Sequence, residues 1–139
     1  MTDLDPRSGP RQDDAEIEII VPAGGEYLSV LRTAAAGLAA RLDFTLDDIE
    51  DLRIAVDEAC AMLLSQARPG SRMTCAFRLG EQAVTFRASV HSAKPTPPSK
   101  TGFAWTVLSA LATAVDARVE EPDVLTIELT RRRPSVSSM

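Results

Sequence analysis

Two adjacent carboxylates, Asp57 and Glu58, stand in the middle of the apolar stretch "LRIAVDEACAMLL" at residues 52–64. Aspartate and glutamate are rarely buried without a partner, so such a pair either faces solvent or belongs to a functional site. On a helix, Glu58 shares a face with Met62 and Asp57 shares a face with Arg53, because each pair is four residues apart. We therefore expect Asp57 and Arg53 to form a surface ion pair, with Glu58 at the border of the core.

Several other chemistries lack the residues that they need. The single histidine, His91, excludes a histidine-rich zinc site and argues against a Ser-His-Asp triad. His91 falls at the end of a predicted strand, beside a loop, where we expect it to be solvated. The chain has neither the GxxxxGK[ST] nor the GxGxxG phosphate-binding motif.

The net charge of −5, from 20 acidic and 15 basic residues, argues against direct binding to nucleic acid, which requires a basic surface. Cys60 and Cys75 lie in apolar runs without motif spacing, so we expect two small core residues of a cytoplasmic protein. No apolar stretch approaches the roughly 18 residues that a membrane helix needs, and the N-terminus has no signal-like apolar segment. We therefore expect no membrane association.

The length of 139 residues fits one domain. We expect a single domain at residues 15–131, between a disordered N-terminal tail at residues 1–14 and a flexible C-terminal tail at residues 132–139. We expect neither a helix nor a strand in the last nine residues, "RRRPSVSSM".

Hydrophobic periodicity predicts eight helices and strands in the order β-α-α-β-β-α-β-β. In residue numbers they are a strand at 16–21, helices at 26–42 and 45–66, strands at 73–79 and 84–90, a helix at 103–115, and strands at 117–121 and 124–130. Five strands, largely in hairpins, with three amphipathic helices predict an α+β two-layer sandwich. The sheet is expected to be mixed but mostly antiparallel, with all three helices on one face.

The apolar patterns of two of these helices also predict which side chains are buried. The helix at 45–66 begins with Thr45 and Asp48, which resemble a capping box. Its expected apolar stripe comprises Ile49, Leu52, Val56, Ala59, Cys60 and Leu63. For the helix at 103–115 the expected stripe comprises Phe103, Val107, Leu111 and Ala114.

Residues 52–62, "LRIAVDEACAM", resemble the stretch that opens the nucleotide site of RsbW-type anti-sigma factors. These are serine kinases of the GHKL, or Bergerat-fold, ATPase superfamily. The family pattern is Leu/Ile-[Lys/Arg]-x-Ala-Val-x-Glu-Ala-x-x-Asn, and this sequence matches it at every specified position except the last. The likeness extends over residues ~16 to 130, and the predicted order of helices and strands is also that of the family.

The resemblance implies that Glu58 occupies the position of the general base, which activates the attacking hydroxyl group. Met62 stands where the family has an asparagine whose side-chain oxygen holds Mg²⁺. Magnesium prefers oxygen ligands, and a thioether is soft, so Met62 cannot replace that ligand.

The other two nucleotide motifs of the family are also altered. "SVHSAKPTPPS" stands where an Asp-x-Gly-x-Gly motif would bind adenine, and only Gly102 remains of a later Gly-x-Gly motif. Bulky Phe103 and Trp105 follow Gly102, and we expect Trp105 to pack in the core, in space that adenine would otherwise occupy. We therefore predict a degenerate ATP site, without a bound cofactor or metal and without efficient kinase activity.

The resemblance further implies partners. Anti-sigma factors of this family dimerise, sequester an alternative sigma factor and are displaced by a STAS-domain anti-anti-sigma factor. Arg32 falls where the family has an arginine that contacts both partners, although it could equally be an ordinary exposed helical arginine. The acids at positions 47, 48, 50 and 51 could dock a basic sigma-factor surface, or could stabilise the start of their helix.

Two alternative functions remain open from the sequence. The chain could be an active serine kinase that uses Mg-ATP to phosphorylate its antagonist. It could also be a sensor that binds a small ligand in the vacated nucleotide pocket.

Overall fold

The computed structural model describes residues 15–134, so the tail expected at 1–14 and residues 135–139 of the tail expected at 132–139 lie outside the described residues. Arg132, the first residue of that expected tail, instead ends the last strand. The helices and strands follow the predicted order. They are β1 (Glu16–Pro22), the 3-10 turn η2 (Gly25–Tyr27), α1 (Leu28–Arg41), α2 (Leu46–Leu64), β2 (Arg72–Leu79), β3 (Ala83–His91), α3 (Phe103–Leu111), β4 (Ala114–Glu120) and β5 (Val124–Arg132).

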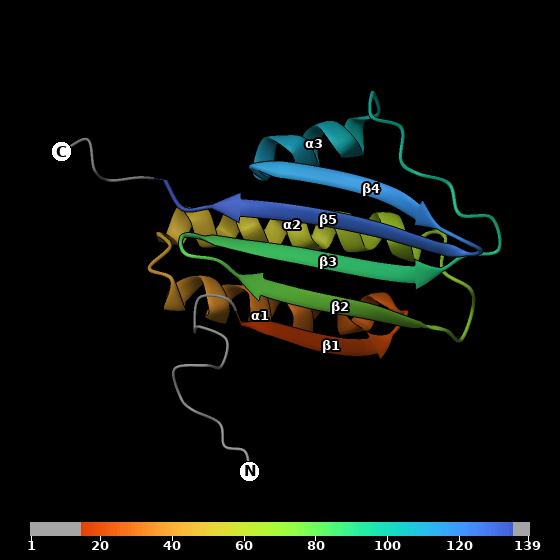
Figure 1. Cartoon of the computed structure of the whole chain (residues 1–139), viewed down its shortest axis with the longest axis horizontal. Helices are drawn as coiled ribbons and strands as arrows, with labels where there is room; N and C mark the ends of the chain where they lie inside the picture. The colour runs from red at the N-terminus through yellow and green to blue at the C-terminus, as the bar shows by residue number, and fades with distance from the viewer. Residues whose placement is uncertain (1–14, 135–139) are drawn as a thin grey trace, which may run out of the picture.

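The five strands form one sheet in the order β1-β2-β3-β5-β4, and the three helices cover one of its faces (Figure 1). The predicted α+β two-layer sandwich is therefore confirmed. All four strand pairings are antiparallel, so the expected mixed sheet is wrong in this detail. The chain crosses from β3 through α3 to the edge strand β4, and β5 then returns between β3 and β4. These two strands run parallel to each other, but β5 lies between them and pairs antiparallel with each.

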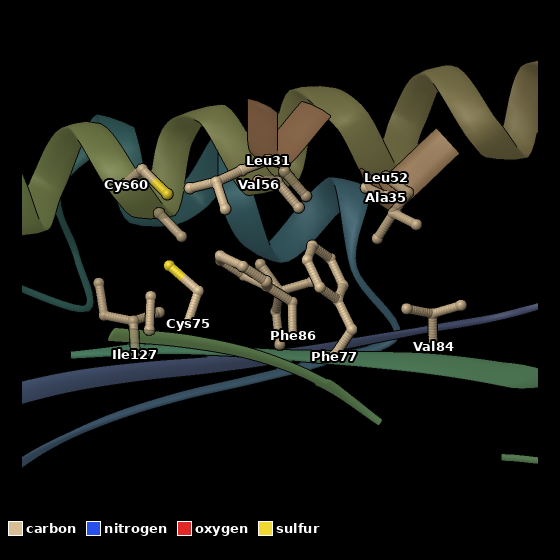
Figure 2. Close-up of a cluster of buried hydrophobic side chains, with 14 of the residues drawn as sticks. Leu31, Ala35, Leu52, Val56, Cys60, Cys75, Phe77, Val84, Phe86 and Ile127 are labelled. Carbon is tan, nitrogen blue, oxygen red and sulfur yellow. The ribbon is translucent and has the colours of Figure 1, made fainter. Parts of the chain in front are cut away.

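The core lies between the sheet and the helices (Figure 2). Phe77 of β2 and Phe86 of β3 are fully buried, with ring centroids 4.9 Å apart. Cys60 of α2 and Cys75 of β2 are also fully buried, as free thiols, which confirms the prediction that both are core residues. Burial raises the pKa of the Cys75 thiol to about 12 and raises the pKa of Cys60 further, where the nearby Cys75 and Asp57 add to the effect.

The start of α2 confirms the predicted cap. The backbone N–H of Asp48 donates to Thr45 Oγ1 at 3.1 Å, and that hydroxyl donates to Asp48 Oδ2 at 2.9 Å. Of the predicted apolar stripe of α2, every residue is buried except Ile49, which is partly buried. Neither α2 nor any other helix within residues 15–134 is long and apolar enough to cross a membrane.

The third helix differs from its prediction in length and in rotation. It ends at Leu111, and Ala114 already pairs with Thr130 in the β4–β5 ladder, because strand pairing overrides the helix propensity of alanine. Its buried residues are Trp105 and Leu108, whereas Phe103 is 84% exposed, so the predicted stripe is wrong except at Leu111, which packs partly buried against the core. Apolar residues lie on several sides of this helix, and only Thr106 and Ser109 are polar, so the sequence pattern does not single out one buried face.

Candidate functional site

Asp57 of α2 contacts α1 rather than its own helix. Arg32 Nη1 donates to Asp57 Oδ1 at 2.9 Å and to Oδ2 at 3.0 Å, and both side chains are 35% exposed. Arg53 instead donates to Glu50 Oε1 at 3.2 Å, so the expected Arg53–Asp57 pair is wrong. The packing of α1 beside α2 supplies a partner that spacing along one helix cannot reveal.

Glu58 and Met62 lie on the other side of α2. Asp51 marks that side, because Arg131 binds Asp51 and also binds the backbone of Leu111 at the end of α3. Glu58 follows Asp51 by seven residues, which is two helical turns, and Met62 follows one turn later. Glu58 and Met62 therefore share the α3-facing side of α2, both partly buried.

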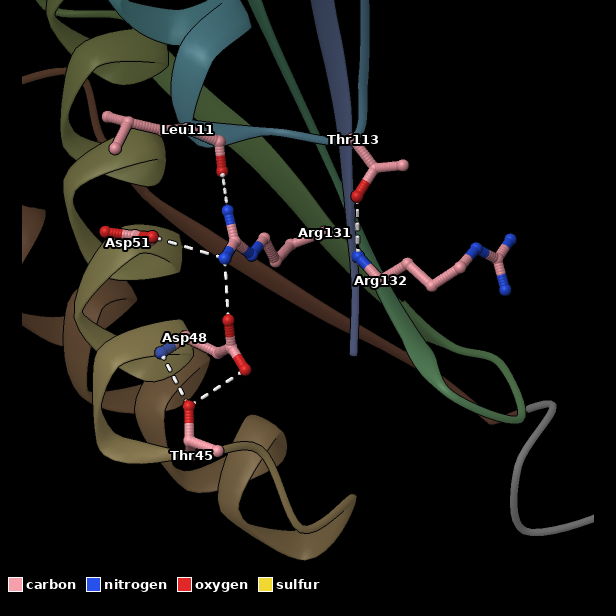
Figure 3. Close-up of polar contacts among 7 residues, drawn as sticks. All are labelled: Thr45, Asp48, Asp51, Leu111, Thr113, Arg131 and Arg132. Carbon is pink, nitrogen blue, oxygen red and sulfur yellow. Dashed lines mark hydrogen bonds and ion pairs between the residues drawn. The ribbon is translucent and has the colours of Figure 1, made fainter. Parts of the chain in front are cut away.

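Arg131, which the sequence interpretation left outside any strand, forms a polar centre with the buried Asp48 (Figure 3). Its Nη2 lies 2.6 Å from Asp48 Oδ1 and 3.2 Å from Asp51 Oδ2, and its Nη1 donates to the Leu111 carbonyl at 2.7 Å. The alternation of "VLTIELTRR" was the available signal, since Arg131 follows Leu125, Ile127 and Leu129 on the helix-facing side of β5. One guanidinium thus ties β5 to the start of α2 and the end of α3.

The Asp48 carboxylate is ionised more readily than an ordinary aspartate. Burial acts to raise its pKa, but the hydrogen bonds from Arg131 and Thr45 and the charge of Arg131 outweigh burial and lower the pKa. Of the four acids considered for docking, two are bound by Arg131 and Glu50 is bound by Arg53. Asp47 is exposed in the first turn of α2.

Gly102 is the N-cap residue of α3 and closes the proline-rich loop at 92–101. Its N–H donates to the Ser99 carbonyl at 3.1 Å, and an added Cβ would lie 3.3 Å from that oxygen, which leaves little room for a side chain. Further back in the loop, Gln66 Nε2 donates to the Thr96 carbonyl at 2.7 Å, and the Thr96 N–H donates to Gln66 Oε1 at 2.9 Å. The side chain of Gln66 therefore holds the loop beside the C-terminal end of α2.

Trp105 and His91 occupy the environments that the sequence predicts. Trp105 is 7% exposed, which confirms that it packs inside the domain, and Lys100 Nζ lies 5.9 Å from its ring centroid. His91 is exposed, with its Nδ1 3.3 Å from Asp123 Oδ1.

The five-stranded antiparallel sheet and its three covering helices define the class, an α+β sandwich consistent with the GHKL-like fold. No protein-family model matches the chain. Its sequence is 46% identical to the serine-protein kinase RsbW of Halalkalibacterium halodurans over 66 residues, which are 47% of this chain and 41% of that protein. It is 37% identical to RsbW of Bacillus cereus over 76 residues, 53% of this chain and 48% of that protein.

A third relative, RsbW of Bacillus thuringiensis, is 44% identical over 52 residues, 37% of this chain and 32% of that protein. The chain thus matches less than half the length of each of these relatives. The resemblance to RsbW-type proteins is confirmed over about half of this chain.

Proposed function

We propose that this chain is an anti-sigma factor of the RsbW type, which sequesters an alternative sigma factor and releases it to a STAS-type anti-anti-sigma factor. In this proposal the chain forms homodimers in the cytoplasm and has no efficient ATP-dependent kinase activity. Similarity to RsbW proteins over about half of the chain supports the partner class.

The arrangement of Glu58 and Met62 carries the argument against an efficient kinase. Both lie on the α3-facing side of α2, one turn apart, so the carboxylate expected to act as general base has a thioether as its neighbour. Mg²⁺ requires hard oxygen ligands, and Met62 provides none, so these residues do not fit the Mg-ATP that the resemblance implies. Two further observations support the proposal. The Gln66–Thr96 hydrogen bonds hold the proline-rich loop against the C-terminal end of α2, and Trp105, which follows Gly102, is buried.

Arg32 is the proposed partner-binding residue. Asp57 holds its guanidinium at the surface between α1 and α2, with both side chains still one-third exposed. An arginine held in place loses less conformational entropy when a partner binds it.

An active serine kinase is the second candidate. Two observations favour it: the relatives are named serine-protein kinases, and Glu58 retains a carboxylate at the general-base position. In that case the chain would phosphorylate its anti-anti-sigma partner.

Thermal unfolding with and without Mg-ATP separates the two candidates. A ligand at about 100 times its Kd stabilises the folded state by roughly 2.7 kcal/mol, so an active kinase should melt at a higher temperature with millimolar Mg-ATP. We expect no shift, and no transfer of labelled phosphate to any STAS-domain protein of the same genome. The anti-sigma role itself requires that the chain bind one of that genome's alternative sigma factors, tested singly as purified proteins.

A further inference from the structure

The α3 helix, "FAWTVLSAL", exposes apolar side chains without any charged residue among them. Only Trp105 and Leu108 are buried, whereas Phe103 is 84% exposed, Val107 is partly exposed and Ala110 is exposed. Phe103, Val107 and Ala110 are spaced by four and three residues, so they form one stripe directed away from the core. The polar residues of α3, Thr106 and Ser109, are exposed beside this stripe, which is therefore the apolar part of the exposed surface of α3.

Apolar residues of α2 extend this stripe. The two helices lie side by side and run antiparallel, since Arg131 joins Asp48 at the start of α2 to Leu111 at the end of α3. Ile54 is 38% exposed and Ala61 is exposed, seven residues apart, so both point outward from the same side of α2. We define the α2–α3 face as Ile54, Glu58 and Ala61 of α2 with Phe103, Val107 and Ala110 of α3.

The only charged member of the α2–α3 face is Glu58. No other residue between 15 and 134 forms an ion pair with it, and α3 offers no positive charge nearby. Lys100 precedes the exposed stripe in the loop before α3, with its ammonium group over the Trp105 ring. A ligand that covers the face must therefore either neutralise Glu58 or bury an unpaired carboxylate, which is costly.

We propose that the α2–α3 face docks an amphipathic helix of a partner protein, with an apolar stripe over Phe103 and Val107 and a lysine or arginine paired with Glu58. A second copy packed through its own α3 fits less well, because an uncharged helix would desolvate Glu58 without pairing it. Asp57, which Arg32 binds, lies three residues after Ile54 and four before Ala61, so the Arg32–Asp57 pair borders the α2–α3 face on its α1 side, away from α3.

Two synthetic helical peptides test this docking surface on the full chain. One carries leucines at helical spacing flanked by lysines, and the other replaces every lysine by glutamate. Neither peptide contains tryptophan, so the fluorescence of Trp105, the single tryptophan of the chain, reports binding beside the stripe. We expect the lysine peptide to bind and the glutamate peptide to bind more weakly.

Three variants locate the binding. Phe103→Ser should weaken binding of the lysine peptide about tenfold or more, because it removes the central apolar contact. Glu58→Gln should reduce the preference for lysine over glutamate peptide without removing binding. Leu46→Ser is the matched control, since Leu46 is also 84% exposed but is the first residue of α2, at the end away from Phe103. This variant should bind the lysine peptide with the affinity of the unaltered chain. Circular dichroism melting checks that all three variants fold.

Four results would overturn the proposal: no binding of the lysine peptide, equal binding of both peptides, the same loss in Leu46→Ser as in Phe103→Ser, or unchanged binding in Phe103→Ser. A dimer detected by light scattering that Phe103→Ser abolishes would instead assign the face to a second copy of this chain. Binding to anionic phospholipid vesicles that the same variant abolishes would assign it to a membrane. None of these outcomes depends on whether a sigma factor binds at Arg32.

Discussion

Arg32 of α1 and Asp57 of α2 form an ion pair in which a single guanidinium nitrogen, Nη1, contacts both carboxylate oxygens, at 2.9 and 3.0 Å. Asp57 thus orients Arg32 without engaging Nη2 or Nε. Because each side chain is 35% exposed, the pair is screened by solvent and contributes less than about 1 kcal/mol to stability. Changes at this pair should therefore affect partner binding more than folding.

Arg32→Glu should weaken binding of the sigma factor, its antagonist or both by about tenfold or more, with a small change in melting temperature. Surface plasmon resonance with the purified partners measures the affinities. Arg41→Glu, an exposed change in the last turn of α1, should leave both affinities unaltered.

A charge exchange separates the role of Arg32 in the ion pair from its role in binding. The double variant Arg32→Glu, Asp57→Arg should recover the melting temperature but not the affinity. Recovery of both would mean that the ion pair, rather than the arginine itself, is what a partner needs.

Glu58→Ala should leave sigma-factor affinity unchanged if the chain acts by sequestration alone. Affinity for the purified sigma factor and transcription from its promoter measure this in vitro. A loss of repression without a loss of sigma binding would indicate that the carboxylate has a catalytic role after all.

Arg131→Met should lower the free energy of unfolding by about 3 kcal/mol, because it leaves the buried Asp48 carboxylate without its charged partner. Arg132→Met is the matched control: the side chain of Arg132 is exposed, so its loss should change stability by less than about 0.5 kcal/mol. Urea denaturation of both variants gives the comparison. Equal effects would show that the Arg131 contacts do not stabilise the domain.

Acid should weaken the same contacts. Since the pKa of Asp48 is lower in the folded than in the unfolded chain, its contribution to stability is present above the ordinary aspartate pKa of about 3.9 and is lost as the pH falls further. Between pH 5 and pH 2, roughly, the Asp48→Asn variant should therefore lose less stability than the unaltered chain. Urea denaturation at several pH values measures the free energy of unfolding of both proteins. An equal loss in both across this range would contradict the role assigned to the Asp48 carboxylate.

The two buried thiols should resist modification in the folded chain. Their raised pKa values keep both protonated near neutral pH, and neither is exposed, so Ellman's reagent should react only after unfolding in guanidinium. Because the folded pKa values are raised, stability should also fall as the pH rises above about 9, where the unfolded thiols ionise. Fast reaction of one thiol without denaturant would show that α2 opens locally from the sheet.

Local signals in the sequence were sufficient for most of the fold. Thr45 and Asp48 mark the start of α2, and the alternation of apolar residues in β2 and β3 identifies both strands and their buried face. The spacing of four residues also placed Glu58 and Met62 on one side of a helix, as the structure has them. These features depend on residues within one or two turns of each other, or along one strand.

The sequence by itself determined the order of the helices and strands, the buried cysteines and the RsbW-like stretch around Glu58. Only the tertiary structure decided that Asp57 pairs with Arg32, that Arg131 extends β5 and pairs with the buried Asp48, and that α3 buries Trp105 and Leu108 while Phe103 faces solvent. Each of these contacts joins residues from different helices and strands. How those elements pack together sets the partner of a charge and the covered side of a helix that has apolar residues on several sides.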